Sequence, residues 1–350
     1  TQAYTLSLHD ALPISADGQR HVLGDIVIDA GGRASQAFEQ LREIGAGGAE
    51  EHEPAGVLYF TRHYRLLDGA APPPRGRAAT TGDLGYLKFG LFPADHGYFS
   101  ITLCLSELDH DLRRAVTDPQ TFDAICRRMP GLAPWVDDRI AVGLGRVRGM
   151  GGLQSLWRDH VRGEQSDALG FFAVGDALIQ TNPLYGRGCA FAAVQAYLLR
   201  DALDASNDPA ERAIAYARAV RHRLRPFYVA MRAQDRAAMR RARRKMSGSA
   251  SRGLLGSVTR SLVEHGVGVA VRSDPEVLRD ALRAFHMLDP PDAWLRRPAN
   301  IASILGAWAR GPARNADAYP DRPGPTRTEL IRALGAGSSQ GGVIEGAAQT

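Results

Sequence analysis

The stretch FFAVGDALIQTNPLYGRGCAFAAVQAYLLRDAL, residues 171–203, contains the signals that decide the fold of this chain. Its apolar opening, 171–174, is short enough to be one buried strand. Asp176 follows this strand, a Pro/Gly turn spans 181–188, and an alanine-rich segment then predicts a closely packed helix. The glycines let a ligand approach the backbone, and the free amides of a first helical turn attract negative charge. This order of elements is typical of an α/β site for a polar ligand.

The spacing within this stretch resembles a known signature. Gly175-Asp176-Ala177 and Pro183-x-x-Gly186-x-Gly188 are similar to the second FAD-binding motif of the superfamily of group A aromatic hydroxylases, tryptophan halogenases and geranylgeranyl reductases. The resemblance implies that Asp176 binds the ribityl hydroxyls. It also implies that the backbone of 186–189 faces the pyrimidine edge of the flavin, where the helix dipole stabilises the anionic reduced ring. The alternative interpretation is an ordinary strand–loop–helix of an unrelated α/β protein.

A second segment, HVLGDIVIDAGGRAS at 21–35, points to the same superfamily. Its predicted strand, 25–30, ends in glycines and resembles the segment that returns the chain to the FAD domain. Aromatic hydroxylases carry an Asp-Gly pair there that also serves NADPH binding, whereas this chain has Gly31-Gly32. This departure weakens the case for direct NADPH binding and suits relatives that take electrons from a separate reductase. The residues to which the resemblance assigns FAD binding are Arg33, Gly175, Asp176, Ala177, Pro183, Gly186, Arg187, Gly188 and Cys189. We expect Cys189 to pack rather than react.

The first fifteen residues contain TLSLHDALPI, which resembles translated sequencing-adapter read-through, so we expect an artefact there. The strand–GxGxxG–helix with which the superfamily begins does not occur in this sequence. We therefore expect the C-terminal part of a longer flavoprotein that binds FAD poorly as given. The predicted fold is α/β (α+β), with an incomplete Rossmann-like domain. The predicted parts are a FAD-binding domain at 16–36 and 150–206, a mixed β-sheet substrate domain at 37–149, a helical region at 207–310 and a disordered tail at 311–350.

In the superfamily, the inserted sheet lies over the flavin and closes the substrate pocket. Aromatic candidates to line this pocket are Tyr59, Tyr64, Tyr86, Phe89 and Trp157, although most such residues are core. His63 and His96 are weak candidates for proton carriers, because both fall at strand or turn positions of the insert; a solvated or core histidine is the commoner case. The Trp-x-Trp-x-Ile-Pro motif of halogenases is absent from the sequence, so no catalytic residue is assigned.

The chain has 350 residues and a net charge of +5, and a predicted helix at 210–245 carries much of its basic charge. A solvated arginine face explains this charge; an anionic membrane surface or an acidic redox partner are the alternatives. No aromatic or zinc pattern points to nucleic acid. Three unspaced cysteines offer neither a disulfide framework nor a metal cluster, which suits a cytoplasmic location, peripheral to the inner membrane if the arginine helix binds lipid. No apolar run is long enough to span a bilayer.

Together these observations predict a FAD-dependent oxidoreductase whose FAD is reduced by NAD(P)H or by a separate flavin reductase. In a monooxygenase, O₂ capture at the flavin C4a position would lead to oxygen transfer onto a hydrophobic or aromatic small molecule. Two alternatives remain open. One is a geranylgeranyl-reductase-like alkene reductase, and the other is a non-catalytic remnant of a flavoprotein.

Overall fold

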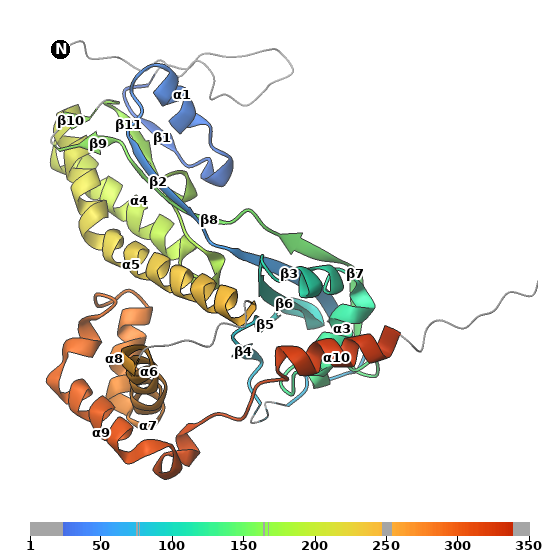
Figure 1. The fold of residues 1–350 in the computed structure, drawn as a ribbon. Helices are drawn as coiled ribbons and strands as arrows, with labels where there is room; N and C mark the ends of the chain where they lie inside the picture. The colour runs from blue at the N-terminus through green and yellow to red at the C-terminus, as the bar shows by residue number, and fades with distance from the viewer. Residues whose placement is uncertain are drawn as a thin grey trace, which may run out of the picture. The chain divides into compact units, whose positions relative to one another are not determined.

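A computed structural model describes residues 24–338 except 75, 77, 164, 167 and 247–253 (Figure 1). The described chain divides into two compact units. Unit 1 comprises 24–55 and 154–235, and unit 2 comprises 56–153 and 236–338. The predicted adapter-derived segment lies outside the described residues. The observed division gives 37–55 and 207–235 to unit 1, whereas the sequence prediction placed them in the substrate domain and the helical region.

Unit 1 contains short strands and two long helices. A parallel pair joins β1 (Val27–Asp29) to β11 (Phe171–Ala173). An antiparallel sheet has the order β12-β8-β2, and a small hairpin pairs β9 with β10. The remaining bounds of this unit are α1 (Ala37–Glu43), β2 (Ala49–Pro54), β8 (Gln154–Asp159), β9 (Val161–Arg162), β10 (Gln165–Ser166), β12 (Ile179–Gln180), α4 (Gly188–Ala205) and the part of α5 (Pro209–Met246) that precedes 236.

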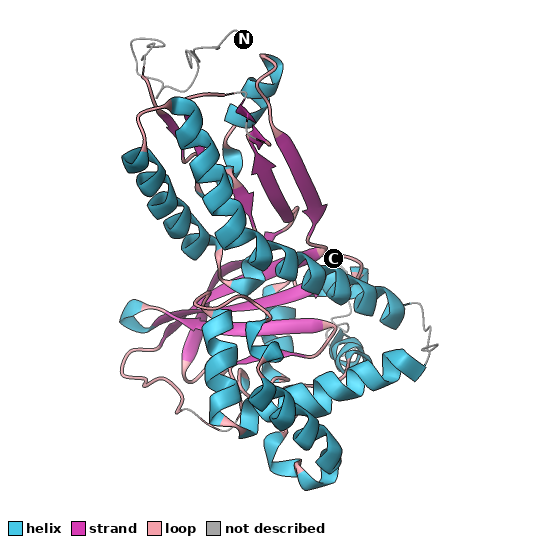
Figure 2. Ribbon diagram, turned by 90° about the vertical axis from the view of Figure 1, so that its left-hand side faces the viewer, coloured by secondary structure: helices cyan, strands magenta, loops and turns pink. Residues whose placement is uncertain are grey.

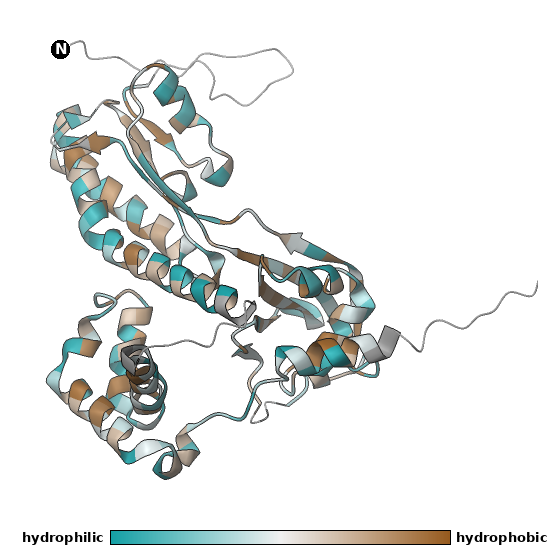
Figure 3. Cartoon of the chain, viewed as in Figure 1, coloured by the Kyte–Doolittle hydropathy of each residue, from teal (hydrophilic) through white to brown (hydrophobic). Residues whose placement is uncertain are grey.

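Helix α5 packs on the antiparallel sheet of unit 1, and both views show it beside these strands (Figures 1 and 2). Tyr228 of α5 lies with its ring centroid 5.3 Å from that of Trp157 on β8. Polar and apolar residues alternate along α5, as Figure 3 shows. Arg221, Arg225 and Arg232 form ion pairs with carboxylates of β8 and β2. Part of the predicted arginine face therefore holds this helix to the sheet of its own unit.

Unit 2 is built on a five-stranded sheet of order β4-β5-β6-β3-β7. Its strands are β3 (Val57–Leu66), β4 (Thr81–Asp83), β5 (Leu87–Pro93), β6 (Tyr98–Ser106) and β7 (Ala141–Met150). All four pairings are antiparallel, so the prediction of a mixed sheet is wrong. The tight turn at 94–97 makes β5 and β6 sequential neighbours, and neighbours joined by so short a turn can only pair antiparallel.

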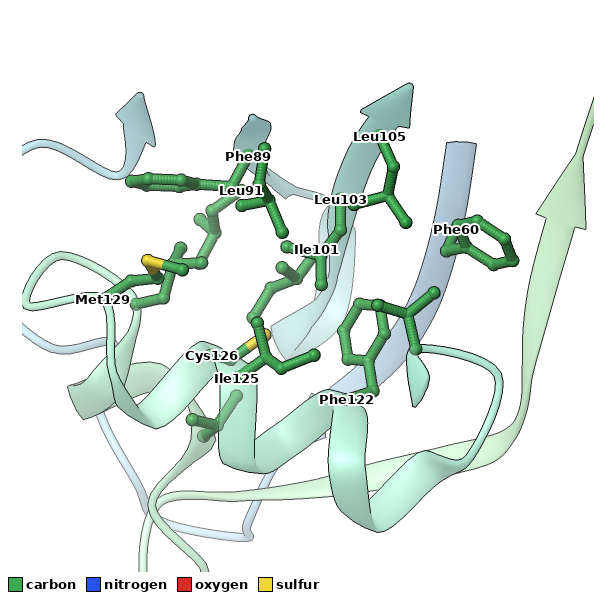
Figure 4. Packing of buried hydrophobic residues seen from close by; sticks show 14 of the residues in the cluster. Phe60, Phe89, Leu91, Ile101, Leu103, Leu105, Phe122, Ile125, Cys126 and Met129 are labelled. Carbon is green, nitrogen blue, oxygen red and sulfur yellow. The ribbon is translucent and has the colours of Figure 1, made fainter. Parts of the chain in front are cut away.

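One face of this sheet is covered by helices α2 (His110–Ala115) and α3 (Pro119–Arg127). Helix α3 begins where Asp118 accepts a hydrogen bond from the Thr121 amide at 2.8 Å and Pro119 takes the first helical position. Its apolar side chains meet alternate residues of the strands, as Figure 4 shows. The residues of this core that Figure 4 labels are Phe60, Phe89, Leu91, Ile101, Leu103, Leu105, Phe122, Ile125, Cys126 and Met129.

The C-terminal part of unit 2 is helical, with α6 (Leu254–Ser261), α7 (Gly268–Ser273), α8 (Pro275–Phe285), α9 (Pro298–Arg314) and α10 (Arg327–Ser338). Leu330 of α10 is fully buried in the core beneath the sheet. The prediction of disorder from 311 is therefore wrong for 311–314, 316–318 and 327–338, which are helical. In α10, one apolar turn of a polar, glycine-rich segment packs on this core. Residues 339–350 lie outside the described part. Among the described helices, none has the length and apolar content needed to cross a bilayer.

Candidate functional site

The parallel pairing of β1 and β11 brings both predicted motifs to one edge of unit 1. Asp29 pairs with Ala173 in register, and the Val174 amide donates to the Asp29 carbonyl at 2.9 Å. Because the carboxyl ends of parallel strands meet at the same edge, the loops that follow them lie together. The two loops contact one another through η1 (Gly32–Ala34) and η4 (Gly175–Ala177).

Asp29 organises the first loop. Its carboxylate accepts from the Gly31 amide at 2.9 Å and from the Ser35 hydroxyl at 2.6 Å. The Gly32 backbone has a φ of +66°, which disfavours residues with a side chain. This local structure places Arg33, which is exposed, on the Asp176 side, where its charge acts to lower the Asp176 pKa.

Gly175 begins the second loop in a left-handed conformation, with a φ of +65°. Its amide donates to the Gln195 side-chain oxygen at 2.5 Å. Gln195 is fully buried on α4, so this bond fastens the loop to the helix that follows it. The bond also fixes the orientation of the amide, because only the oxygen can accept from an N–H group.

Asp176 is half-buried, and no residue in the described part of the chain donates a hydrogen bond to its carboxylate. Burial raises its pKa above the ordinary value, and the nearby Arg33 only partly opposes this. A Cβ placed on Gly188 would lie 3.9 Å from Asp176 Oδ1. The carboxylate therefore faces the start of α4, where the helix has no side chain.

The turn between the strand and α4 is open on one side and anchored on the other. Gly186 has a φ of +62°, is exposed, and has no atom within 4 Å of where its Cβ would lie. The other side is held by Asp235 of α5, which is only 6% exposed. The Asp235 carboxylate accepts from the Asn182 side-chain amide at 3.0 Å and from the Tyr185 hydroxyl at 2.8 Å.

Helix α4 begins directly after this turn. The Phe191 amide donates to the Arg187 carbonyl at 2.8 Å, so the amides of residues 188–190 have no partner within the helix. These amides and the helix dipole favour a negative charge at this end. Cys189 is exposed there, which corrects the prediction that it packs. Its neighbour Arg187 is half-buried, with its guanidinium carbon 5.5 Å from the Phe227 ring centroid.

Of the predicted cofactor residues, the structure brings Gly175, Asp176, Gly188 and the open Gly186 turn around α4. Sequence reasoning missed the side chains that hold this arrangement, Gln195 and Asp235. Neither belongs to a recognised motif, and both are distant in sequence from the loops that they hold. A buried polar residue inside an apolar helix stripe was the available signal at Gln195.

The catalytic candidates lie in unit 2. His63 is exposed on β3, opposite Ser100 and Leu144 in the register of the sheet. His96 is exposed in the turn before β6 and has a φ of 54°. Three of the aromatic candidates are core residues instead, because Tyr64, Phe89 and Trp157 are at most 5% exposed. Tyr86 is also largely buried, and its hydroxyl donates to the Pro325 carbonyl at 2.9 Å.

Among the described residues, no group of three or more histidine, cysteine, aspartate or glutamate side chains is placed to hold a metal ion. The candidate site in unit 1 thus consists of a carboxylate, exposed backbone amides and glycines. Its chemistry suits hydroxyl groups and a planar, electron-accepting ring.

No protein-family model matches the chain, and no curated protein matches it. Among solved structures, the chain is similar to PqsL, a probable FAD-dependent monooxygenase from Pseudomonas aeruginosa, with 19% identity, a TM-score of 0.47, and coverage of 66% of this chain and 59% of that one. It is also similar to OxyS, an anhydrotetracycline hydroxylase from Streptomyces rimosus, with 16% identity, a TM-score of 0.46, and coverage of 79% and 48%.

A third similar structure is CabE, an aromatic hydroxylase from angucycline biosynthesis, with 19% identity, a TM-score of 0.42, and coverage of 63% and 41%. The chain thus spans about three fifths of the length of PqsL and less of the other two. The described chain is structurally similar to FAD-dependent aromatic hydroxylases and monooxygenases over part of its length.

Proposed function

We propose that the loops of unit 1 hold the isoalloxazine and ribityl part of FAD, and that the chain is a FAD-dependent oxidoreductase of the monooxygenase type acting on a hydrophobic or aromatic small molecule. The observation that carries the proposal is the Asp176 carboxylate, which is half-buried and accepts no hydrogen bond from the described residues. A carboxylate that is partly withdrawn from water needs hydrogen-bond donors. The ribityl hydroxyls of FAD are donors of the required kind.

The shape of the site supports a planar ring beside this carboxylate. Gly188 puts no side chain beside Asp176 at the start of α4, and the space at Gly186 is open. The free amides of 188–190 and the helix dipole would stabilise negative charge on a reduced ring. The charge of Arg33 would hold the first loop near Asp176. The hydrogen bonds of Asn182 and Tyr185 to Asp235 would hold the turn that precedes α4.

When bound, FAD supplies the redox chemistry, and the residues of the chain bind and orient it. Asp176 would hold the sugar-like chain, and the amides at the start of α4 would bind the pyrimidine edge. Gln195 accepts a hydrogen bond from the Gly175 amide and would thereby fix Asp176 relative to the start of α4, so that the carboxylate and the α4 amides can contact the flavin together. No residue of unit 1 is assigned a proton-transfer role. His63 and His96 stay candidates for one on the substrate side.

Titration of riboflavin and FAD into the purified chain, followed by quenching of flavin fluorescence, tests the binding site. We expect Asp176→Ala to weaken binding of both flavins by about tenfold or more, since a charge-assisted hydrogen bond is lost. The matched control is Asp204→Ala, an exposed carboxylate on helix α4 of the same unit. Equal affinities for Asp176→Ala, Asp204→Ala and the parent chain would remove Asp176 from the site.

The reaction type needs a separate test. The alternative of an alkene reductase differs from a monooxygenase in its need for O₂. Turnover of aromatic substrates should therefore occur in air with a flavin reductase present and stop under nitrogen. Product formation that continues without oxygen favours the reductase. A chain that quenches no flavin fluorescence supports the third possibility, a non-catalytic remnant.

A further inference from the structure

A groove in unit 2 lies between α2 and the end of β7. Its volume is about 560 Å³, and its floor is formed by Leu58 and Phe60 of β3. Both floor residues adjoin the sheet core. The groove therefore offers an apolar surface that is large enough for a small aromatic or aliphatic group.

Glycines on either side of Met150, at the end of β7, keep this floor accessible. Gly149 stands opposite Phe60 in the register of the sheet, and a Cβ on Gly149 would lie 3.5 Å from Phe60 Cε1. A Cβ on Gly151 would lie 2.8 Å from Leu58 Cδ2. Any larger residue at these two positions would occupy the groove directly above the floor.

The opposite wall is basic. His110, Arg113, Arg114 and Thr117 recur at helical spacing of three and four residues, so they share one face of α2 and the turn after it. All four are exposed, whereas Leu112 and Val116, on the other face, are fully buried in the core. The fold thus separates an apolar face, which packs inward, from a cationic face along the groove.

The acidic residues near this wall are already engaged. Arg327 of α10 binds Asp109 with two hydrogen bonds of 2.8 Å and Asp111 with one of 2.9 Å. Asp118 caps α3 through the Thr121 amide and hydroxyl. Within the described part of the chain, neither Arg113 nor Arg114 forms an ion pair. Two adjacent arginines beside His110 therefore remain without a neutralising carboxylate.

We propose that this groove binds a small amphipathic anion, an aromatic or short aliphatic carboxylate whose apolar part lies on Leu58 and Phe60. Arg113 and Arg114 bind the carboxylate, and the guanidinium groups give it a bidentate partner. All residues of this groove belong to unit 2, whereas the proposed flavin loops belong to unit 1.

Isothermal titration calorimetry with 2-naphthoate tests this site, with 2-naphthol as the neutral analogue and inorganic phosphate as the anion without an apolar part. We expect saturable 1:1 binding of 2-naphthoate to the chain, and weaker binding of the other two. The double variant R113E/R114E should weaken 2-naphthoate binding by about tenfold or more, while Gly149→Leu should weaken both naphthalene ligands by occupying the groove.

The charge-matched control is R240E/R241E, two adjacent exposed arginines on α5 of the same unit. This control should bind 2-naphthoate as the parent does. If charge reversal at α2 impairs folding, judged by circular dichroism, R113Q/R114Q replaces it in the test. Equal 2-naphthoate affinity in the α2 variant and the control, or no saturable binding by the parent chain, overturns the proposal.

Discussion

Two polar clusters in the molecule differ in how fully their groups are satisfied. In unit 2, Asp123 of α3 binds Arg62 at 2.5 Å and accepts from the Tyr64 hydroxyl at 2.6 Å, so its carboxylate has partners on both oxygens. In unit 1, Asp176 has no hydrogen-bond donor among the described residues although it is half-buried. The Asp123 carboxylate is complete without a ligand, and the Asp176 carboxylate is not.

The difference separates structural polar groups from candidate binding groups. Buried polar groups that have all their partners fasten the sheet to its helices. A partly buried group that lacks them either costs stability or awaits a ligand. His160 of unit 1 shares this second condition, because both of its ring nitrogens are buried without a partner in the described chain. Substitutions in the two clusters should therefore act in opposite directions on stability.

The largest effect is expected at Asp123. Asp123→Ala removes the partner of a largely buried arginine and of the Tyr64 hydroxyl, so we expect a loss of about 3 kcal/mol or more in the free energy of unfolding. Urea denaturation followed by circular dichroism measures it. The matched control is Asp138→Ala, whose carboxylate forms an exposed pair with Arg127. A loss no larger than that of the control would mean that this cluster does not fasten α3 to the sheet.

A second effect is expected at His160, whose ring stands edge-on to Phe38 and Phe171. Burial lowers its pKa from 6.5 to about 4, so the folded state binds its proton more weakly than the unfolded state. Stability should be complete above pH 6.5 and fall by about 3 kcal/mol as the pH drops towards 4, a value that follows from the pKa difference.

His160→Leu should flatten this part of the pH profile, whereas His222→Gln, at an exposed histidine of α5, should leave it unchanged. Urea midpoints between pH 4 and pH 7 provide the measurement. A profile of His160→Leu that still falls as steeply as that of the parent chain would show that the imidazole is hydrated in solution.

The comparison also explains how far the sequence could predict this molecule. Strand β11 and helix α4 could be predicted from the sequence because an apolar run and a Pro/Gly turn are local signals. Helix α10 could not be predicted in this way, since Leu330, Ile331 and Leu334 pack on a core formed by residues far away in the chain. The same limit applies at the site. The Asp176 motif is local, but Asp235, which holds the turn, acts from α5 and has no signature of its own.

The smallest effect is expected at Asp176, and its sign should be opposite to that at Asp123. Burial raises the Asp176 pKa, so the folded state holds this proton more tightly than the unfolded state does. The contribution of Asp176 to stability is therefore fully present below its unfolded pKa and is lost as the pH rises through the higher folded value. At neutral pH the unliganded chain should carry a small cost from an ionised carboxylate without donors.

Asp176→Asn should remove that cost, and the variant should unfold at a slightly higher urea concentration than the parent chain at pH 7. The two should coincide at pH 3, where the parent carboxyl is protonated. With flavin added at pH 7, the parent should instead unfold at the higher urea concentration. Only the parent presents a charged acceptor to the ribityl hydroxyls, and a ligand stabilises the folded state to which it binds. An Asp176→Asn chain that is less stable than the parent without flavin would mean that Asp176 already has its partners, and would place it with Asp123 among the structural carboxylates.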